Sequence, residues 1–348
     1  MSGKLSDLVS NYGEMMNKDE YVIETDKLAK TYHGGIKAVK GIDMKIQKGQ
    51  IYGFLGPNGA GKTTTIKMLS TSIKPTSGSA RVMGYDITAE SMKVRKVIGV
   101  VPQDLTTDED LKGIENLELV ARFYDVPPRE ARRKAEELLD LVDLSEFGDK
   151  YVGTYSGGMR KRLELIVGLI HNPKVLFLDE PTLGLDVQTR TKMWEYIRKV
   201  KEEFGMTIVL TSHYLEEVDE LADIISIIDH GQIIVTGTPE ELKNSLQGDI
   251  IEATFSDSIQ SKKFGEYSKS IDVTYPRDNV VRMKVKDSDR EVPHIMKYMS
   301  DNNLSPIRFN ISKPSLDQVF LDYTGREIRE EEAGDTRKAQ MNMRRLRK

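Results

Sequence analysis

The stretch IYGFLGPNGAGKTTTIKMLS, residues 51–70, joins a short apolar run, a glycine-rich loop and a helix-forming segment. Its centre, GPNGAGKTT (56–64), fits the pattern G-x-x-x-x-G-K-[ST], in which backbone N–H groups close on a phosphate. A chance glycine turn is the alternative, but this motif follows a strand pattern and opens a helix, as a phosphate loop does. The stretch therefore predicts an α/β fold with a nucleotide site at the end of a buried strand.

The side chains of this loop have separate expected tasks. Lys62 would reach the β- and γ-phosphate oxygens and act in catalysis, and the Thr63 hydroxyl would ligate Mg²⁺. The expected nucleotide contacts in this loop are consecutive in the sequence: Gly56, Pro57, Asn58, Gly59, Ala60, Gly61, Lys62, Thr63 and Thr64.

The run VLFLDEP (175–181) reads as a buried strand that ends in two acids. Asp179 would hold Mg²⁺ through water, and Glu180 would polarise the attacking water as the general base. On their own, two acids at a strand end would more often form a solvated turn. Together with a phosphate loop upstream, they predict a site that hydrolyses a nucleotide.

Three more residues stand at the ends of predicted strands or turns. His213 follows the strand TIVLTS and would hold the transferred phosphoryl group and the water. Gln103 follows the predicted strand KVIGVV (96–101) and could touch Mg²⁺ or the attacking water. Tyr32 lies near a turn and could stack on adenine, although packing would explain it equally well. The other histidines are expected to be structural: His33, His171, His230 and His294.

The stretch YSGGMRKRLELI (155–166) is an unusual helix start. Ser156 is a good N-cap, but Arg160, Lys161 and Arg162 follow it in the first turn, where the helix dipole is already positive. A local rule that is broken often marks a site built for something other than stability. Two glycines, a hydroxyl and a cationic helix start suggest a second anion-binding site.

Length and composition bound the possible functions. A chain of 348 residues with a net charge of −4 has room for two or three domains and no global basic field for nucleic acid. Its longest apolar runs are far shorter than the ~18 residues that span a bilayer, and no secretory signal is expected. The absence of cysteine excludes disulfides and thiol catalysis. A cytoplasmic protein is expected, with any membrane spanning left to another chain.

Four segments are expected along the chain. A loosely held segment (1–20) precedes a nucleotide-binding α/β domain (21–244), into which a helical block of about residues 104–170 is inserted. An accessory α+β domain (245–325) and a charged tail (326–348) follow. The strand, helix, strand, strand, helix, strand order within the accessory domain suits a small ferredoxin-like module.

Several of these residues and motifs occur in a characteristic order and spacing: Tyr32, GPNGAGKTT, Gln103, YSGGM, VLFLDEP, GLD (184–186) and His213. Over residues 21–240 the chain resembles the nucleotide-binding subunits of ABC transporters. The resemblance implies a P-loop NTPase fold, with a RecA-like core, an inserted helical subdomain and an N-terminal β subdomain. It also implies ATP and Mg²⁺ as ligands, with Thr63, Gln103 and Asp179 around the metal.

In that family two copies dimerise head to tail, and the second anion-binding site of each copy closes on the γ-phosphate of the ATP that the other copy holds. The resemblance therefore implies that Ser156, Gly157 and Gly158 contact ATP in trans within a homodimer, with the helix start behind them supplying positive potential. Asp186 matches the loop that links the two sites across the dimer.

The variant YSGGMRKRLE has Tyr155 and Met159 where leucine and glutamine are usual, and it resembles the daunorubicin-resistance group of exporter ATPases. The segment PSLDQVFLDYTG (314–325) is similar to the ending of those subunits. The resemblance implies an ATPase that drives export of a drug, lipid or other amphiphile through a separate ABC-2 type permease. The permease's coupling helices would dock near Gln103, and the protein would lie on the cytoplasmic face of the membrane.

Other interpretations remain open at this stage. The basic end RKAQMNMRRLRK could bind anionic lipid at about 1 kcal/mol per cation, although such tails are more often solvated. A soluble ABC-type ATPase acting on ribosomes or DNA is disfavoured, because those proteins usually carry two cassettes or a very long insertion, and no nucleic acid partner is expected. A regulatory module without turnover is disfavoured by the presence of both Glu180 and His213.

Overall fold

The computed structural model describes residues 21–246, 248–267 and 272–324. The chain forms two compact units, and the division between them falls between Thr238 and Pro239. The boundary expected from the sequence, 244/245, lies just after the short helix α9 (Pro239–Asn244), which belongs to the second unit. The expected segments 1–20 and 326–348, with the basic tail, lie outside the described residues.

A six-stranded sheet forms the centre of the first unit, with strand order β10-β9-β3-β8-β7-β6. Neighbouring strands are parallel except for β10, which is antiparallel to β9. Every residue of β3, β7 and β8 is buried, as expected for parallel strands that are covered on both faces. The strands are β3 (Ile51–Leu55), β6 (Ile98–Val101), β7 (Val175–Asp179), β8 (Thr207–Ser212), β9 (Ile224–Asp229) and β10 (Gln232–Gly237).

The predicted strand over 96–101 is shorter than expected, because helix α3 (Ser91–Val97) continues to Val97 and β6 begins at Ile98. Arg95 and Lys96 lie in the last turn of α3, where the negative end of the helix dipole favours positive charge. The apolar run VIGVV is thus divided between a helix end and a strand.

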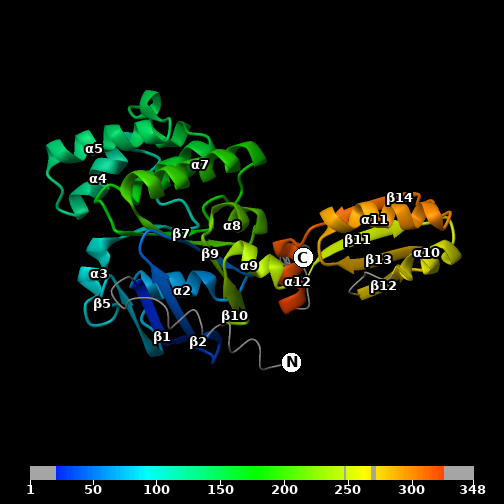
Figure 1. Ribbon diagram of the computed structural model, residues 1–348. Coiled ribbons are helices and arrows are strands. Elements are labelled where there is room, and N and C mark those ends of the chain that lie inside the picture. Colours follow the sequence, from blue (N-terminus) through cyan, green and yellow to red (C-terminus); the bar gives the residue numbers. More distant parts are fainter. Residues whose placement is uncertain (1–20, 247, 268–271, 325–348) are drawn as a thin grey trace, which may run out of the picture. The chain divides into compact units, whose positions relative to one another are not determined.

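The inserted helical block contains α4 (Gly113–Phe123), α5 (Pro128–Leu141) and α6 (Gly157–Val167). Figure 1 shows α4 and α5 grouped together, at the end of this unit away from β1 and β2. The proline at the first turn of α5 and the Ser156 side chain at the start of α6 are favourable helix starts. The other helices of this unit are α2 (Lys62–Leu69), α7 (Val187–Phe204) and α8 (Leu215–Leu221), and two 3₁₀ turns span Ser145–Phe147 and Val152–Thr154.

The N-terminal strands form a second, antiparallel sheet of order β2-β1-β4-β5. Its apolar face packs in one core with α2 and with residues of the six-stranded sheet such as Phe54 and Phe177. The buried Thr25 hydroxyl donates to the Ile42 carbonyl oxygen (2.9 Å) and accepts from Met44 N (2.8 Å), which ties β1 to β2. The strands are β1 (Tyr21–Thr31), β2 (Lys37–Gln47), β4 (Ser77–Val82) and β5 (Tyr85–Asp86).

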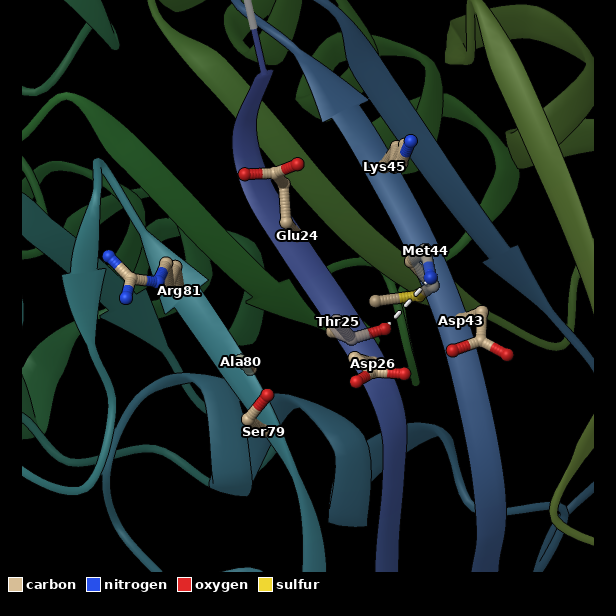
Figure 2. Close-up of a pocket in the computed structure, with 9 residues that line it drawn as sticks. All are labelled: Glu24, Thr25, Asp26, Asp43, Met44, Lys45, Ser79, Ala80 and Arg81. Carbon is tan, nitrogen blue, oxygen red and sulfur yellow. Dashed lines mark hydrogen bonds between the residues drawn. The ribbon is translucent and has the colours of Figure 1, made fainter. Parts of the chain in front are cut away.

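A shallow hollow of about 570 Å³ lies on this antiparallel sheet (Figure 2). The exposed side chains of Lys45, Glu24 and Arg81 stand in register on the neighbouring strands β2, β1 and β4. Alternating charges of this kind stabilise a solvated sheet face. The hollow contains none of the residues that the sequence predicts to bind nucleotide.

The second unit has a four-stranded antiparallel sheet of order β12-β13-β11-β14 and its own apolar core, which includes Phe255, Phe264 and Met283. Figure 1 shows α11 lying along this sheet, and Ile295 of α11 packs in that core. The element order β11-α10-β12-β13-α11-β14 is the predicted ferredoxin-like order. The elements are β11 (Asp249–Thr254), α10 (Ser258–Gly265), β12 (Asp272–Arg277), β13 (Val280–Val285), α11 (Ser288–Asp301), β14 (Arg308–Ser312) and α12 (Leu316–Thr324).

No helix in the described part of the chain combines the length and the apolar character that a membrane crossing requires.

Candidate nucleotide-binding and catalytic site

A cleft of about 640 Å³ lies at the carboxyl ends of the central parallel strands. It brings together six predicted site residues from widely separated motifs: Tyr32, Lys62, Thr63, Gln103, Glu180 and His213. Loop residues Pro57, Asn58, Gly59, Gly61 and Thr64 line it as well. Ligands of open α/β sheets bind at this edge of the sheet.

Two glycines of the loop are required by close packing. A Cβ at Gly56 would lie 2.2 Å from the carbonyl oxygen of Ile228. Gly61 has a φ of +111°, and a Cβ there would lie 2.6 Å from the carbonyl oxygen of Ala38. These two positions therefore accept only glycine, because the loop packs directly against the backbone of Ile228 and Ala38 there.

The Lys62 side chain is buried at the centre of the loop. Its Nζ donates to the carbonyl oxygens of Gly56 (2.6 Å) and Pro57 (3.2 Å), and it lies 3.5 Å from Glu180 Oε1. The ammonium thus stands between the loop and the acid that follows β7. A phosphate held by the loop would meet this charge directly.

Thr63 and Asp179 supply two adjacent oxygens. The Thr63 hydroxyl donates to Asp179 Oδ1 at 3.0 Å, and the buried Thr211 hydroxyl donates to the same oxygen at 2.6 Å. Mg²⁺ in nucleotide sites is held by one or two protein oxygens, with phosphate and water completing the shell. The Thr63 and Asp179 pair fits that donor set.

Glu180 is buried in a left-handed backbone conformation, with φ +52°. Its backbone N donates to both the carbonyl oxygen (3.2 Å) and the hydroxyl (3.1 Å) of Thr211, which holds this uncommon geometry. A non-glycine residue in this region signals a conformation that its surroundings enforce.

The Glu180 carboxylate is paired on both sides. Oε2 lies 3.1 Å from His213 Nδ1, and Oε1 faces Lys62 Nζ. Burial acts to raise the pKa of Glu180, but the hydrogen bond with His213 and the charge of Lys62 outweigh it and hold the pKa below its ordinary value. The carboxylate is therefore ionised at neutral pH and can accept a proton.

Tyr32 and Gln103 lie at the rim of the same cleft. The Tyr32 side chain is 40% exposed, its hydroxyl lies 3.5 Å from Thr64 Oγ1, and Lys30 Nζ lies 5.5 Å from its ring centroid. An exposed ring at a nucleotide cleft is available for stacking on a base. The backbone carbonyl of Gln103 accepts a hydrogen bond from Lys161 Nζ at 2.7 Å.

Ser156, Gly157 and Gly158 do not line this cleft, and neither does Asp186. Ser156 caps α6, with its Oγ accepting from Met159 N at 3.3 Å, and Asp186 caps α7 by accepting from Thr189 N at 2.9 Å. Within the described chain these four residues thus form two helix starts separate from the phosphate loop.

The three cations at the start of α6 each bind an acceptor in their own chain. Arg160 contacts the Glu109 carboxylate and the Gly153 carbonyl oxygen, and Arg162 donates to the Val142 carbonyl oxygen at 2.8 Å. Lys161 binds the Gln103 carbonyl. The expectation that all three lie in the first turn was wrong, because α6 begins at Gly157 and only Arg160 falls within its first 3.6 residues. The dipole penalty therefore concerns Arg160, whose contacts with Glu109 and Gly153 offset it.

Sequence reasoning missed several residues of the site. Leu183 lines the cleft, and so do Ile36, Lys37 and Ala38 from β2 and the turn before it. Thr211 holds both Asp179 and the Glu180 backbone, although it lies inside an apolar strand run. The available signal was that the buried strand TIVLTS ends in two hydroxyl residues, Thr211 and Ser212, at the edge of the sheet where the cleft lies.

The chain is similar to known proteins over most of its length. The family model described as ABC transporter matches residues 39–183, and the model described as ATP-binding protein DrrA1-3-like, C-terminal domain, matches residues 237–324. The daunorubicin/doxorubicin resistance ATP-binding protein DrrA of Streptomyces peucetius is 41% identical over 87% of this chain and 92% of its own length. The Nod factor export ATP-binding protein I of Ralstonia nicotianae is 33% identical over 89% of this chain and 95% of its own length.

Among solved structures, a dimeric ATP-binding cassette bound to ADP and Pi in a post-hydrolysis state is similar, with a TM-score of 0.58 and 27% identity. That match covers 62% of this chain and 98% of the other. One assignment follows from the phosphate loop, from Asp179 and Glu180 at the end of β7, and from the similarity over nearly the full length of DrrA. The chain belongs to the ATP-binding proteins of the ABC transporter family, in the DrrA-like group.

Proposed function

We propose that this protein binds and hydrolyses ATP with Mg²⁺ and so powers an exporter of a drug, lipid or other amphiphile, whose membrane path is a separate ABC-2 type permease. The observation that carries the proposal is the meeting of Lys62, Glu180 and His213 at the phosphate loop. The names of the relatives, which concern drug resistance and Nod factor export, support the exporter assignment.

In the proposed reaction a water oxygen attacks the γ-phosphorus of ATP. The bond from that phosphorus to the bridging oxygen breaks, so that ADP and phosphate are formed, and a proton of the water passes to Glu180. Lys62 stabilises the charge on the transferred group, and His213 holds Glu180 and the water in position. Thr63 and Asp179 would hold Mg²⁺, which neutralises phosphate charge when it is bound, and Gln103 would complete its surroundings.

The proposed active form is a head-to-tail homodimer. Ser156, Gly157 and Gly158 would reach the ATP of the second copy, and Asp186 would lie in the loop linking the two sites. Support comes from the position of these residues outside their own chain's cleft and from the related cassette that was solved as a dimer. ATP would shift the pair toward its closed state by binding that state better.

The permease would dock on the helical block. On α4, Leu119 and Phe123 are separated by one turn and so face the same side, and they are 38% and 76% exposed. Leu105, in the same loop as Gln103, is 42% exposed. Exposed apolar side chains near Gln103, which would contact the bound nucleotide, are suited to bind the short coupling helices of a membrane partner. In this arrangement the protein sits at the cytoplasmic face of the membrane.

The alternative of an ATPase acting on ribosomes or DNA finds no support among the reported relatives, and no nucleic acid partner is proposed. A contact of the basic tail with anionic lipid is kept as a minor hypothesis.

The proposal is tested by purifying the tagged protein from native membranes and identifying what co-purifies by mass spectrometry. A polytopic permease is the expected partner, and ribosomal proteins in its place would contradict the exporter assignment. The dimer is tested separately: Glu180→Gln with Mg-ATP should show twice the monomer mass, and adding Ser156→Arg should prevent this. A monomer at high concentration with ATP bound would refute the trans role of Ser156.

A further inference from the structure

The loop 102–107, which carries Gln103 to the nucleotide cleft, is held along its length by one helix, α6. At the start of the loop, Lys161 Nζ donates to the Gln103 carbonyl oxygen at 2.7 Å. At its far end, Glu164 accepts from the backbone N of Thr106 at 2.5 Å and of Thr107 at 2.6 Å. The Thr106 hydroxyl donates to the other carboxylate oxygen at 2.8 Å.

Both clamping side chains are nearly inaccessible to solvent, with exposed fractions of 8% for Lys161 and 2% for Glu164. A buried charge is stable only when it is fully hydrogen-bonded or paired, and hydrogen bonds to charged groups are about twice as strong as neutral ones. Neither side chain can give up its loop contacts without leaving a buried ion unsatisfied. The loop and α6 are therefore firmly joined.

The same helix begins at Ser156, followed by Gly157 and Gly158. Ser156 precedes Lys161 by five residues, which is roughly 8 Å along the axis of a helix. A single helix thus connects the loop at the chain's own cleft with the residues assigned to the ATP of a second copy. The presence of Lys161 near the start of α6 is thus explained by its contact with loop 102–107 and not by the sequence of the helix itself.

We propose that Lys161 and Glu164 are positioning residues that make loop 102–107 and α6 move as one body. Through them, nucleotide sensed at Gln103 in one copy sets the position of Ser156, Gly157 and Gly158 toward the ATP of the other copy. This inference rests on the proposed function, because it needs ATP in the cleft and a dimer. Coupling of this kind is a difference in binding free energy and is reciprocal between the two sites.

A purely structural role for Glu164 is the alternative. The next part of the loop has its own anchor, because Asn116 Oδ1 accepts from Asp108 N at 2.8 Å and its Nδ2 donates to the Asp108 carbonyl oxygen at 3.0 Å. Loss of Glu164 should therefore release the 103–107 stretch from α6 without unfolding the helical block. The two roles differ in what they predict for dimerisation.

The test uses full-length protein in the Glu180→Gln background, with two measurements on each variant. A fluorescent ATP analogue is titrated at low protein concentration to give the nucleotide dissociation constant of the monomer. Sedimentation velocity with Mg-ATP gives the dimer dissociation constant. The variants are Glu164→Leu, Glu164→Gln and Lys161→Met, and the control is Arg162→Met, which removes a carbonyl contact of the same helix that does not reach the loop.

Glu164→Leu should leave nucleotide binding by the monomer within about twofold and weaken ATP-dependent dimerisation by roughly tenfold. Lys161→Met should act in the same direction, and it keeps the test decisive if Glu164→Leu does not fold. Glu164→Gln should dimerise almost as the parent does, because its Oε1 can still accept from both backbone N–H groups. Arg162→Met should dimerise as the parent does.

If the parent dimerises with ATP, unchanged dimerisation of Glu164→Leu or Lys161→Met would overturn the proposed role of these residues. Equal weakening of dimerisation by Arg162→Met would overturn it as well. A parent that bound no ATP or stayed monomeric would instead overturn the proposed function and this inference with it.

Discussion

Glu180 and His213 form a buried hydrogen-bonded pair, with Glu180 Oε2 3.1 Å from His213 Nδ1. The pair arises because β7 and β8 are parallel neighbours in which Asp179 is opposite Thr211. The residues that follow the two strands are thereby brought to the same edge of the sheet, beside Lys62.

Replacing Glu180 by glutamine should lower kcat for ATP hydrolysis by roughly 10²–10⁴-fold, because the side chain can no longer accept the proton of water. The amide oxygen can still contact the same neighbours, so nucleotide affinity should change little. Steady-state phosphate release and a nucleotide titration check both points. Glu216→Gln, at an exposed position of α8, is the matched control and should keep full activity. Equal rates for the two variants would remove Glu180 from the reaction.

The lowered pKa of Glu180 predicts a definite pH dependence of stability. A carboxyl group whose pKa is lower in the folded state stabilises the fold above its unfolded value, which is 4.5 here, and this contribution is lost as pH falls through the folded value. Glu180→Gln has no such contribution. The difference in melting temperature between wild type and Glu180→Gln should therefore shrink as pH falls below about 4.5. A difference that grows on acidification would contradict this assignment of charges.

Glu217 should behave in the opposite way. It is fully buried in α8, where Oε1 accepts from the Thr182 hydroxyl (2.8 Å) and from Trp194 Nε1 (3.2 Å). Burial raises the pKa of Glu217, although hydrogen bonds from Ser212, Thr182 and Trp194 act to lower it. A carboxyl group with a raised pKa gives its full stability below the unfolded value and loses it as pH rises through the folded value.

Glu217→Gln stays neutral at every pH and should therefore gain melting temperature relative to wild type as pH rises from about 4.5 toward 8. Because Trp194 is the only tryptophan, its emission reports this site alone. The emission should be nearly unchanged in Glu217→Gln, which keeps an acceptor for the indole, and altered in Glu217→Ala. A wild type that gains stability over this pH range relative to Glu217→Gln would refute the prediction.

Gly157→Ala separates a role in the fold from a role toward a second copy. Apart from its sequence neighbours and the backbone of its own helix, a Cβ at Gly157 would have no heavy atom of the described chain within 4 Å, so the melting temperature should not fall. If this glycine contacts ATP of the partner copy, the added methyl group should weaken ATP-dependent dimerisation, measured by sedimentation in the Glu180→Gln background. Gly56→Ala is the contrasting variant, because its Cβ would collide with the Ile228 carbonyl and should disturb the fold itself.

The position of a motif in the cleft could be predicted from the sequence where the motif consists of consecutive residues. GPNGAGKTT and VLFLDEP fix their own local geometry, and both reach the cleft as expected, through Lys62, Thr63 and Glu180. His213 also reached the cleft, because parallel strands end at the same edge of a sheet.

Contacts set by tertiary packing could not be predicted. The sequence of α6 alone gives no partner for Lys161, because its acceptor lies 58 residues away at Gln103. Thr211 and Glu164 were missed for the same reason, since a hydroxyl in a strand or an acid in a helix shows no partner until the strands and loops are packed. The end of α3 at Val97 likewise depends on where β6 begins to pair with β7.

Each of the two units has a separate apolar core, one around Phe54 and Phe177 and the other around Phe255 and Phe264. A junction near Thr238 interrupts neither core, so each unit can fold around its own apolar residues. We expect a chimaera to fold if it joins this ATPase unit to the C-terminal unit of another exporter. Recombination could then exchange the two units as evolutionary modules.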